Sequence, residues 1–238
     1  MRTEAATALR ACSISLVLAG IACGQNGGDG DDHALSGPEI IARMVEMDRL
    51  RTAQLREYTS VRLYHLENRR FQKTAEMTVQ LRFRHPGRKE FAILSESGSG
   101  VIRERVFRRM LDAELEAGSE PMRQATQITL ENYDFRFAGV DSDRGRRTYR
   151  FEILPKVWNR FMIQGRVWLD AEDFAITRIE GKPAKNPSVW IRSTTFVHTY
   201  EKLGPFWLAA SNASRSDSLL FGHTSVAIRY MDYQVNPR

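Results

Sequence analysis

The clearest pattern in the chain is a strict alternation of apolar and polar residues between positions 75 and 84. A period of two is typical of a strand that buries one of its faces. The apolar face of this strand would carry Ala75, Met77, Val79, Leu81 and Phe83. Weaker alternation predicts a preceding strand over 58–67, a turn at 68–70 and a third strand over 89–95.

The segment after residue 133 is predicted to be strand almost throughout. Its linkers at 141–145, 170–173 and 203–205 are short and rich in Asp, Gly or Pro, which is the chemistry of hairpin turns. The candidate strands cover 135–140, 147–154, 161–169, 174–180, 189–202, 206–214 and 225–235. The pattern therefore predicts an α+β fold, mostly β, built on a long antiparallel meander.

Two segments show helical spacing instead. The first, over 38–55, follows a capping-box pattern in which Ser36 precedes Glu39 by three positions. The second covers 102–117, where apolar residues recur every three or four positions and charged residues fill the opposite side. Gly118 fits the end of this second helix. We expect this second, amphipathic helix to cover a face of the sheet.

The first 22 residues have the organisation of a secretory signal peptide. Two arginines flank a polar start, and an uncharged run of about 12 residues follows, which is too short to span a membrane. The run ends at Cys23, a candidate for lipid attachment as in bacterial lipoproteins; the alternative is ordinary cleavage. Residues 23–37 form a Gly/Asp-rich tether, and 38–238 a single domain. We expect a periplasmic protein, either anchored to the outer membrane through Cys23 or free to diffuse.

The charge balance favours acidic partners. The formal net charge is +6 at neutral pH, which suits an anionic membrane surface or merely aids solubility. Nucleic acid, the other common acidic partner, is excluded by the predicted export. Both cysteines, Cys12 and Cys23, lie at the N-terminus, so the folded domain has neither a disulfide nor a cysteine nucleophile.

No set of residues at recognisable spacing predicts catalysis, a metal or a cofactor. The loop 98–100 lacks the residues of a hydrolase elbow or of a phosphate-binding loop. The acidic cluster at 170–173 fits a turn better than a calcium loop. The histidines lack metal-ligand spacing; they are His33, His65, His85, His198 and His223. A hydrolase with a scattered triad is a third hypothesis, which the lack of a nucleophile–base pair at recognisable spacing weighs against.

Residues 165–180 read GRVWLDAEDFAITRIE. This stretch resembles the strand, Trp-x-Asp turn and strand of the LolA/LolB/RseB superfamily, the outer-membrane lipoprotein-sorting-like proteins. The order of signal peptide, helix, strands, helix and long meander agrees with the same family. The resemblance implies a strongly curved antiparallel half-barrel sheet with helices packed on its concave face, and a monomer that binds acyl chains or lipidated proteins without chemistry.

The predicted ligand site is an apolar cavity between the sheet and the helix at 102–117. Alternation and helical spacing select its lining: Met77, Val79, Leu81, Phe83, Phe91, Ile93, Val106, Met110, Tyr149, Phe151 and Ile153. The same residues would also suit a plain filled core. The leading hypothesis is an exported lipid or lipoprotein binder or carrier. The alternative is an envelope sensor or regulatory module that binds a partner protein through its sheet.

Overall fold

The computed structural model describes residues 35–186 and 190–236. The predicted signal peptide and Cys23 lie outside the described residues, as does most of the predicted tether. Leu35 packs against an apolar cluster, and the carboxylate of Glu39 accepts a hydrogen bond from the backbone N–H of Ser36 at 2.8 Å. The described fold therefore includes the last residues of the segment predicted as tether.

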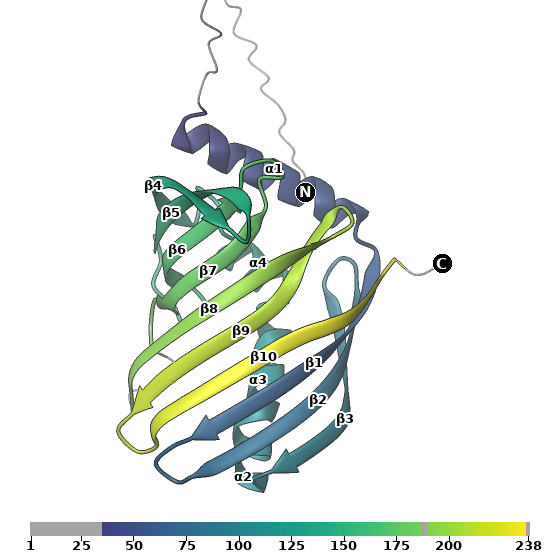
Figure 1. Cartoon of the computed structure of the whole chain (residues 1–238), viewed down its shortest axis with the longest axis vertical. Coiled ribbons are helices and arrows are strands. Elements are labelled where there is room, and N and C mark those ends of the chain that lie inside the picture. Colours follow the sequence, from purple (N-terminus) through teal and green to yellow (C-terminus); the bar gives the residue numbers. More distant parts are fainter. Residues whose placement is uncertain (1–34, 187–189, 237–238) are drawn as a thin grey trace, which may run out of the picture. The chain divides into compact units, whose positions relative to one another are not determined.

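The described part of the chain forms one ten-stranded antiparallel sheet, in the order β3-β2-β1-β10-β9-β8-β7-β6-β5-β4 (Figure 1). Its first three strands are β1 (Glu57–Asn68), β2 (Lys73–Arg84) and β3 (Arg88–Gly98). The meander adds β4 (Tyr133–Asp143), β5 (Arg146–Pro155), β6 (Ile163–Asp170), β7 (Ile176–Pro183), β8 (Ile191–Leu203), β9 (Phe206–Ser218) and β10 (Gly222–Val235). The sheet is not closed, because β3 and β4 pair on one side only. The predicted meander is confirmed.

The helices follow the prediction with two differences. Helix α1 (Gly37–Gln54) matches the expected first helix. The second runs through α2 (Gly100–Ile102), a π-helical turn over Arg103–Phe107, and α3 (Arg108–Ala117). A short further helix, α4 (Glu120–Thr126), was not predicted, although Ser119 and Pro121 are typical of a helix start. No helix among the described residues is long and apolar enough to cross a membrane.

The core consists of two apolar clusters on the same face of the sheet. The α1 cluster joins Ile40, Ile41 and Met44 to strands β5, β6 and β7. The α3 cluster joins Phe107 and Leu111 to strands β1, β2 and β10.

Strand pairing places the two clusters on one face. Directly paired residues of antiparallel strands point to the same side. Pairing links Tyr64, Ile228, Asn212, His198, Ile179, Val167 and Phe151 across seven neighbouring strands. We call this the inner face.

A candidate binding pocket under helix α1

The residues predicted to line a cavity do lie on the inner face, but the space next to many of them is filled. Met77 and Val79 are fully buried in one cluster with Phe107, which is also fully buried, and Leu81 is fully buried too. Side chains of the α3 cluster thus occupy the region where the cavity was expected. Phe91, Val106 and Met110 pack at its margin.

The remaining predicted lining residues lie elsewhere. Phe83 stacks on Tyr58 with ring centroids 5.0 Å apart, and Ile93 is 38% exposed on the edge strand β3. Phe151 and Ile153 are buried in the α1 cluster, and Tyr149 packs against that cluster. The structure therefore distributes the predicted site over two clusters, and their role in ligand binding stays a prediction.

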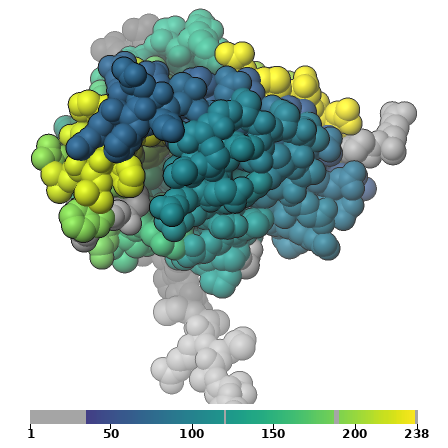
Figure 2. All heavy atoms as spheres, turned by 90° about the horizontal axis from the view of Figure 1, so that it is seen from below, coloured from purple at the N-terminus to yellow at the C-terminus, as the bar shows by residue number. Residues whose placement is uncertain are grey.

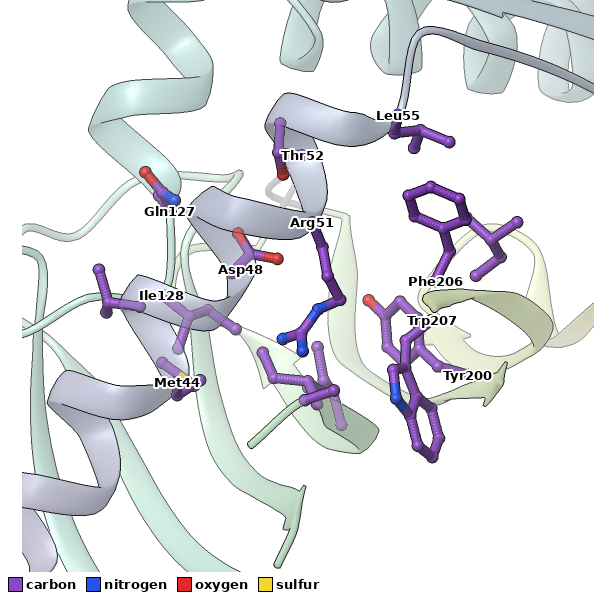
Figure 3. A pocket seen from close by; sticks show the side chains of 15 residues that line it. Met44, Asp48, Arg51, Thr52, Leu55, Gln127, Ile128, Tyr200, Phe206 and Trp207 are labelled. Carbon is purple, nitrogen blue, oxygen red and sulfur yellow. The ribbon is translucent and has the colours of Figure 1, made fainter. Parts of the chain in front are cut away.

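The structure instead shows a cavity of about 240 Å³ between α1 and strands β7, β8 and β9 (Figure 3). Most of its lining is apolar, and α1 contributes three polar residues, Asp48, Arg51 and Thr52. The lining consists of Met44, Val45, Asp48, Arg51, Thr52, Leu55, Gln127, Ile128, Ala175, Ile176, Ile179, Tyr200, Phe206, Trp207 and Leu208. None of the residues selected from the sequence belongs to it.

The polar part of this pocket comes from one face of α1. Met44, Asp48 and Arg51 succeed one another at helical spacing, so the side of the helix that faces the sheet changes from apolar to charged. Burial raises the pKa of Asp48, although Arg51 and Arg123 act in the opposite direction. Burial likewise lowers the pKa of Arg51 despite the nearby carboxylate of Asp48. Desolvation is thus the largest influence on the pKa of both groups.

The turn between β6 and β7 closes one end of the pocket. The guanidinium of Arg51 donates to the carbonyl oxygen of Asp173 at 2.9 Å. The carboxylate of Asp173 accepts from the indole N–H of Trp207 at 3.0 Å and pairs with Lys202 at 2.6 Å. These contacts join α1, the turn and the β8–β9 hairpin around the cavity.

That turn also explains the acidic cluster of the sequence. The Asp170 side chain is 1% exposed and is paired with Arg146 at 2.5 Å. It also accepts hydrogen bonds from the backbone N–H groups of Glu172 and Asp173. Asp170 is therefore a turn-stabilising residue, as the hairpin reading predicted. Within the described residues, no group of three or more potential ligands could hold a metal ion.

A strip of polar and aromatic side chains separates the two clusters on the inner face. The ring of His198 stacks on Tyr200 at 4.6 Å and on Tyr230 at 5.9 Å. Burial, followed by the charge of Arg62, lowers the pKa of His198 to about 4. Burial also raises the pKa of Tyr200 to about 12. The imidazole is therefore neutral at neutral pH.

A buried ion-pair network attaches α3 to the sheet. The guanidinium of Arg62 on β1, only 5% exposed, pairs with Glu114 at 2.5 Å. Lys89 on β3 pairs with the other oxygen of Glu114 at 2.7 Å. Burial alone would raise the pKa of Glu114, but Lys89 and Arg62 outweigh it and hold that pKa below its ordinary value. The network was not predicted, although Arg62 shares the buried register of Tyr64 and Leu66 on β1.

A second hollow of about 530 Å³ lies along β4, β5 and β6. Ile153 is the one predicted lining residue that borders it. Its other walls include Arg136 and Glu152, which form an ion pair with each other. Four of the nine residues that line this hollow are charged, against two of the fifteen that line the cavity under α1, so the cavity under α1 is the better candidate for an apolar ligand.

No family model matches the chain, and no curated protein matches it. Similar folds occur among solved structures. A domain from Vibrio parahaemolyticus, described provisionally as an outer membrane lipoprotein-sorting protein, is 13% identical over 81% of this chain and 92% of its own, with a TM-score of 0.40. A LolA superfamily protein from Nitrosomonas europaea is 10% identical over 86% of this chain and 96% of its own, with a TM-score of 0.36.

The MucA/MucB complex from Pseudomonas aeruginosa contains a further similar chain. It is 11% identical over 83% of this chain and 100% of its own, with a TM-score of 0.27. The structures similar to this chain thus include LolA-superfamily proteins, as the hairpin at 165–180 predicted. All three TM-scores lie below 0.5, so functional inference rests on the residues of this chain.

Proposed function

We propose that the chain is an exported, non-enzymatic protein of the bacterial cell envelope that binds the acyl chain of a lipid or of a lipidated protein. The single observation that carries the proposal is the cavity under α1, with its largely apolar lining and the cation of Arg51 inside it. Burying an acyl chain in such a place yields about 0.8 kcal/mol per methylene. Arg51 suits a carboxylate or phosphate at the polar end of the ligand.

The size of the cavity limits what it can hold at rest. At about 240 Å³ it is smaller than the ligand sites of roughly 300–1,000 Å³ found in most binding proteins. It therefore accommodates the end of an acyl chain. To hold a whole acyl chain, the protein must move α1 or α3 away from the inner face of the sheet. We place this inner face on the concave side of a half-barrel.

Uptake of a fluorescent fatty acid by the purified chain tests this proposal. Thr52→Trp places a large ring in the cavity, whereas Ala53→Trp adds the same ring at the neighbouring exposed position of α1. We expect Thr52→Trp to weaken uptake at least tenfold and Ala53→Trp to leave it unchanged. Equal uptake by both variants would exclude the pocket, and no uptake by the wild-type chain, with a lipid-free mass in native mass spectrometry, would exclude acyl binding.

We further propose that Cys23 bears lipid and tethers the domain to the outer membrane. The Gly/Asp-rich segment that follows Cys23 would let the domain stand away from the bilayer. Cys23→Ser should move the protein from the membrane fraction to the soluble periplasmic fraction and remove the mass of the acyl groups. A wild-type protein that is already soluble and unmodified would make a diffusing carrier the correct interpretation.

A second candidate function is binding of a partner protein at the open edge of the sheet. Strand β4 pairs with β5 only, and Phe137 and Val140 on it are 47% and 48% exposed. An extended segment of a partner could add a strand at such an edge. This candidate function predicts that the chain captures one envelope protein. Capture should persist after lipid removal and in Thr52→Trp, but should be lost in Phe137→Asp/Val140→Asp.

A further inference from the structure

The turns at the two ends of the sheet differ in whether they expose large apolar side chains. Successive turns of an antiparallel meander alternate between the ends. The β1–β2 turn, the β9–β10 turn and the loop before β8 share one end. Their exposed apolar residues form what we call the apolar tip: Phe71, Trp190, Leu219, Leu220 and Phe221, each 45–57% exposed.

The opposite end lacks such side chains. Among the described residues of its turns, at 85–87, 144–145, 171–175 and 204–205, no large hydrophobic side chain is exposed. The loop after β5, which shares the end of the apolar tip, adds Val157 at 66% and Trp158 at 54% exposure. The asymmetry is therefore a property of one whole end and exceeds what scattered exposed residues would give.

Direct contacts hold the parts of the apolar tip together. The rings of Phe71 and Phe221 meet edge-on with centroids 6.4 Å apart. The side-chain amide of Asn68 donates to the carbonyl oxygen of Phe221 at 2.8 Å, and the backbone N–H of Leu219 donates to the carbonyl oxygen of Trp190 at 3.0 Å. Figure 2 looks onto this end and shows the β1–β2 turn in blue beside the β9–β10 turn in yellow.

Basic side chains surround the apolar tip. Arg69 and Arg192 have 78% and 62% of their side chains exposed, and Arg70 and Lys73 are exposed in the same β1–β2 hairpin. Arg70 also donates to the carbonyl oxygen of Leu219 at 3.1 Å, bridging the two turns. The nearby carboxylates of Glu67 and Asp217 offset only part of this positive charge.

We propose that the apolar tip docks on an anionic lipid bilayer, with its aromatic and leucine side chains in the interfacial region and its arginines on the headgroups. Aromatic residues and leucine favour the membrane interface, and neighbouring cations add attraction to anionic lipids. A second copy of the chain suits this surface less well, because two like-charged tips would repel each other. This inference goes beyond the proposed acyl binding, since Phe206 and Trp207 of the pocket follow the turn at the opposite end.

Flotation of the full chain with vesicles tests the proposal. The vesicles contain 30% phosphatidylglycerol in phosphatidylethanolamine, or phosphatidylcholine alone. The tip variant is Phe71→Ser/Leu220→Ser/Phe221→Ser. A matched control, Leu50→Ser/Leu94→Ser/Leu115→Ser, removes three exposed apolar side chains from α1, β3 and α3, outside the apolar tip. All chains compared in this experiment also carry Cys23→Ser, so that no lipid on Cys23 holds them to the vesicles, and circular dichroism checks that each one folds.

We expect the tip variant to bind anionic vesicles at least tenfold more weakly and the control to bind like the wild-type chain. Arg69→Gln/Lys73→Gln should weaken binding roughly fivefold for each charge removed. Brominated lipids should quench the fluorescence of Trp190, measured as the difference between the wild-type chain and Trp190→Phe.

Equal binding of all variants together with an unquenched Trp190 would overturn the proposal. A tip variant that changes the oligomeric state in light scattering, without changing vesicle binding, would instead assign the surface to contacts between copies. Fatty-acid uptake by the tip variant should stay normal. Loss of docking and loss of acyl binding are thus separable outcomes.

Discussion

Replacing Glu114 by glutamine should lower the free energy of unfolding by much more than the loss of one exposed ion pair would. The Arg62 side chain is 5% exposed, and Glu114 and Lys89 are 26% and 21% exposed. Breaking a buried ion pair on one side costs 3–5 kcal/mol, because the remaining charge stays buried without its partner. Since Glu114 keeps a quarter of its surface in water, we expect the low end, about 3 kcal/mol.

The assay is urea unfolding followed by circular dichroism and tryptophan fluorescence. A loss of about 3 kcal/mol corresponds to a fall in melting temperature of roughly 6–12 °C for a domain of this size. The triple variant Arg62→Met/Lys89→Met/Glu114→Leu replaces all three charges of the network by apolar groups and should lie close to the wild-type stability. The control Glu46→Gln breaks the exposed pair with Arg49 on α1 and should leave the midpoint unchanged.

The result also has a pH signature. The pKa of Glu114 lies below its ordinary value in the folded protein, so the unfolded chain takes up the proton first as the pH falls. The stabilisation is complete above the unfolded-state pKa of about 4.5 and is lost on acidification through the folded-state value. A Glu114→Gln variant with wild-type stability at pH 7 would refute the reasoning, because it would mean that water screens the network as it screens a surface pair.

Three further predictions concern single residues. Because the pKa of His198 is lowered from 6.5 to about 4, the free energy of unfolding should fall by about 3 kcal/mol as the pH drops from 6.5 to 4. His198→Phe, which keeps the ring stack, should remove this pH dependence in urea titrations at each pH. Gly165→Ala would place its Cβ 2.0 Å from the carbonyl oxygen of Glu180 and should cost about 2 kcal/mol in thermal unfolding, whereas Gly100→Ala should be tolerated. Asp170→Ala should cost about 2 kcal/mol, because it leaves two turn amides without their acceptor and removes the buried partner of Arg146. A wild-type melting temperature would show that the turn holds without Asp170.

The strands were predictable because each pattern reflects one local cause. The alternation from 75 to 84 arises because this strand buries one of its faces. The apolar positions that alternation selected on β2 and β5 lie on the inner face in the strand pairing. The capping pattern of Ser36 and Glu39 likewise depends only on neighbouring residues. Such features need no knowledge of distant parts of the chain.

The site was less predictable because it joins distant segments. The cavity combines α1 with residues near 128, 176 and 207, and no periodicity relates these positions. Two signals were nevertheless present in the sequence. Asp48 and Arg51 continue the apolar stripe of α1 with charged residues, and Arg62 occupies the buried register of β1. Charged residues at core positions mark places where polar groups are paired in the interior.

The positions of the apolar tip and the pocket constrain any transfer of lipid between them. Strand β8 has 13 residues, so its ends are about 40 Å apart, with the pocket near one end and the apolar tip near the other. The polar strip around His198 and the α3 cluster lie on the inner face between them. An acyl chain that enters from a bilayer at the apolar tip must therefore displace α3 before it reaches α1. On this route, the variant Arg62→Met/Lys89→Met/Glu114→Leu, which should keep stability but removes the ion pairs of Glu114 that attach α3 to the sheet, should speed lipid uptake from vesicles without changing uptake of free fatty acid. Equal rates for the variant and the wild-type chain would exclude the route.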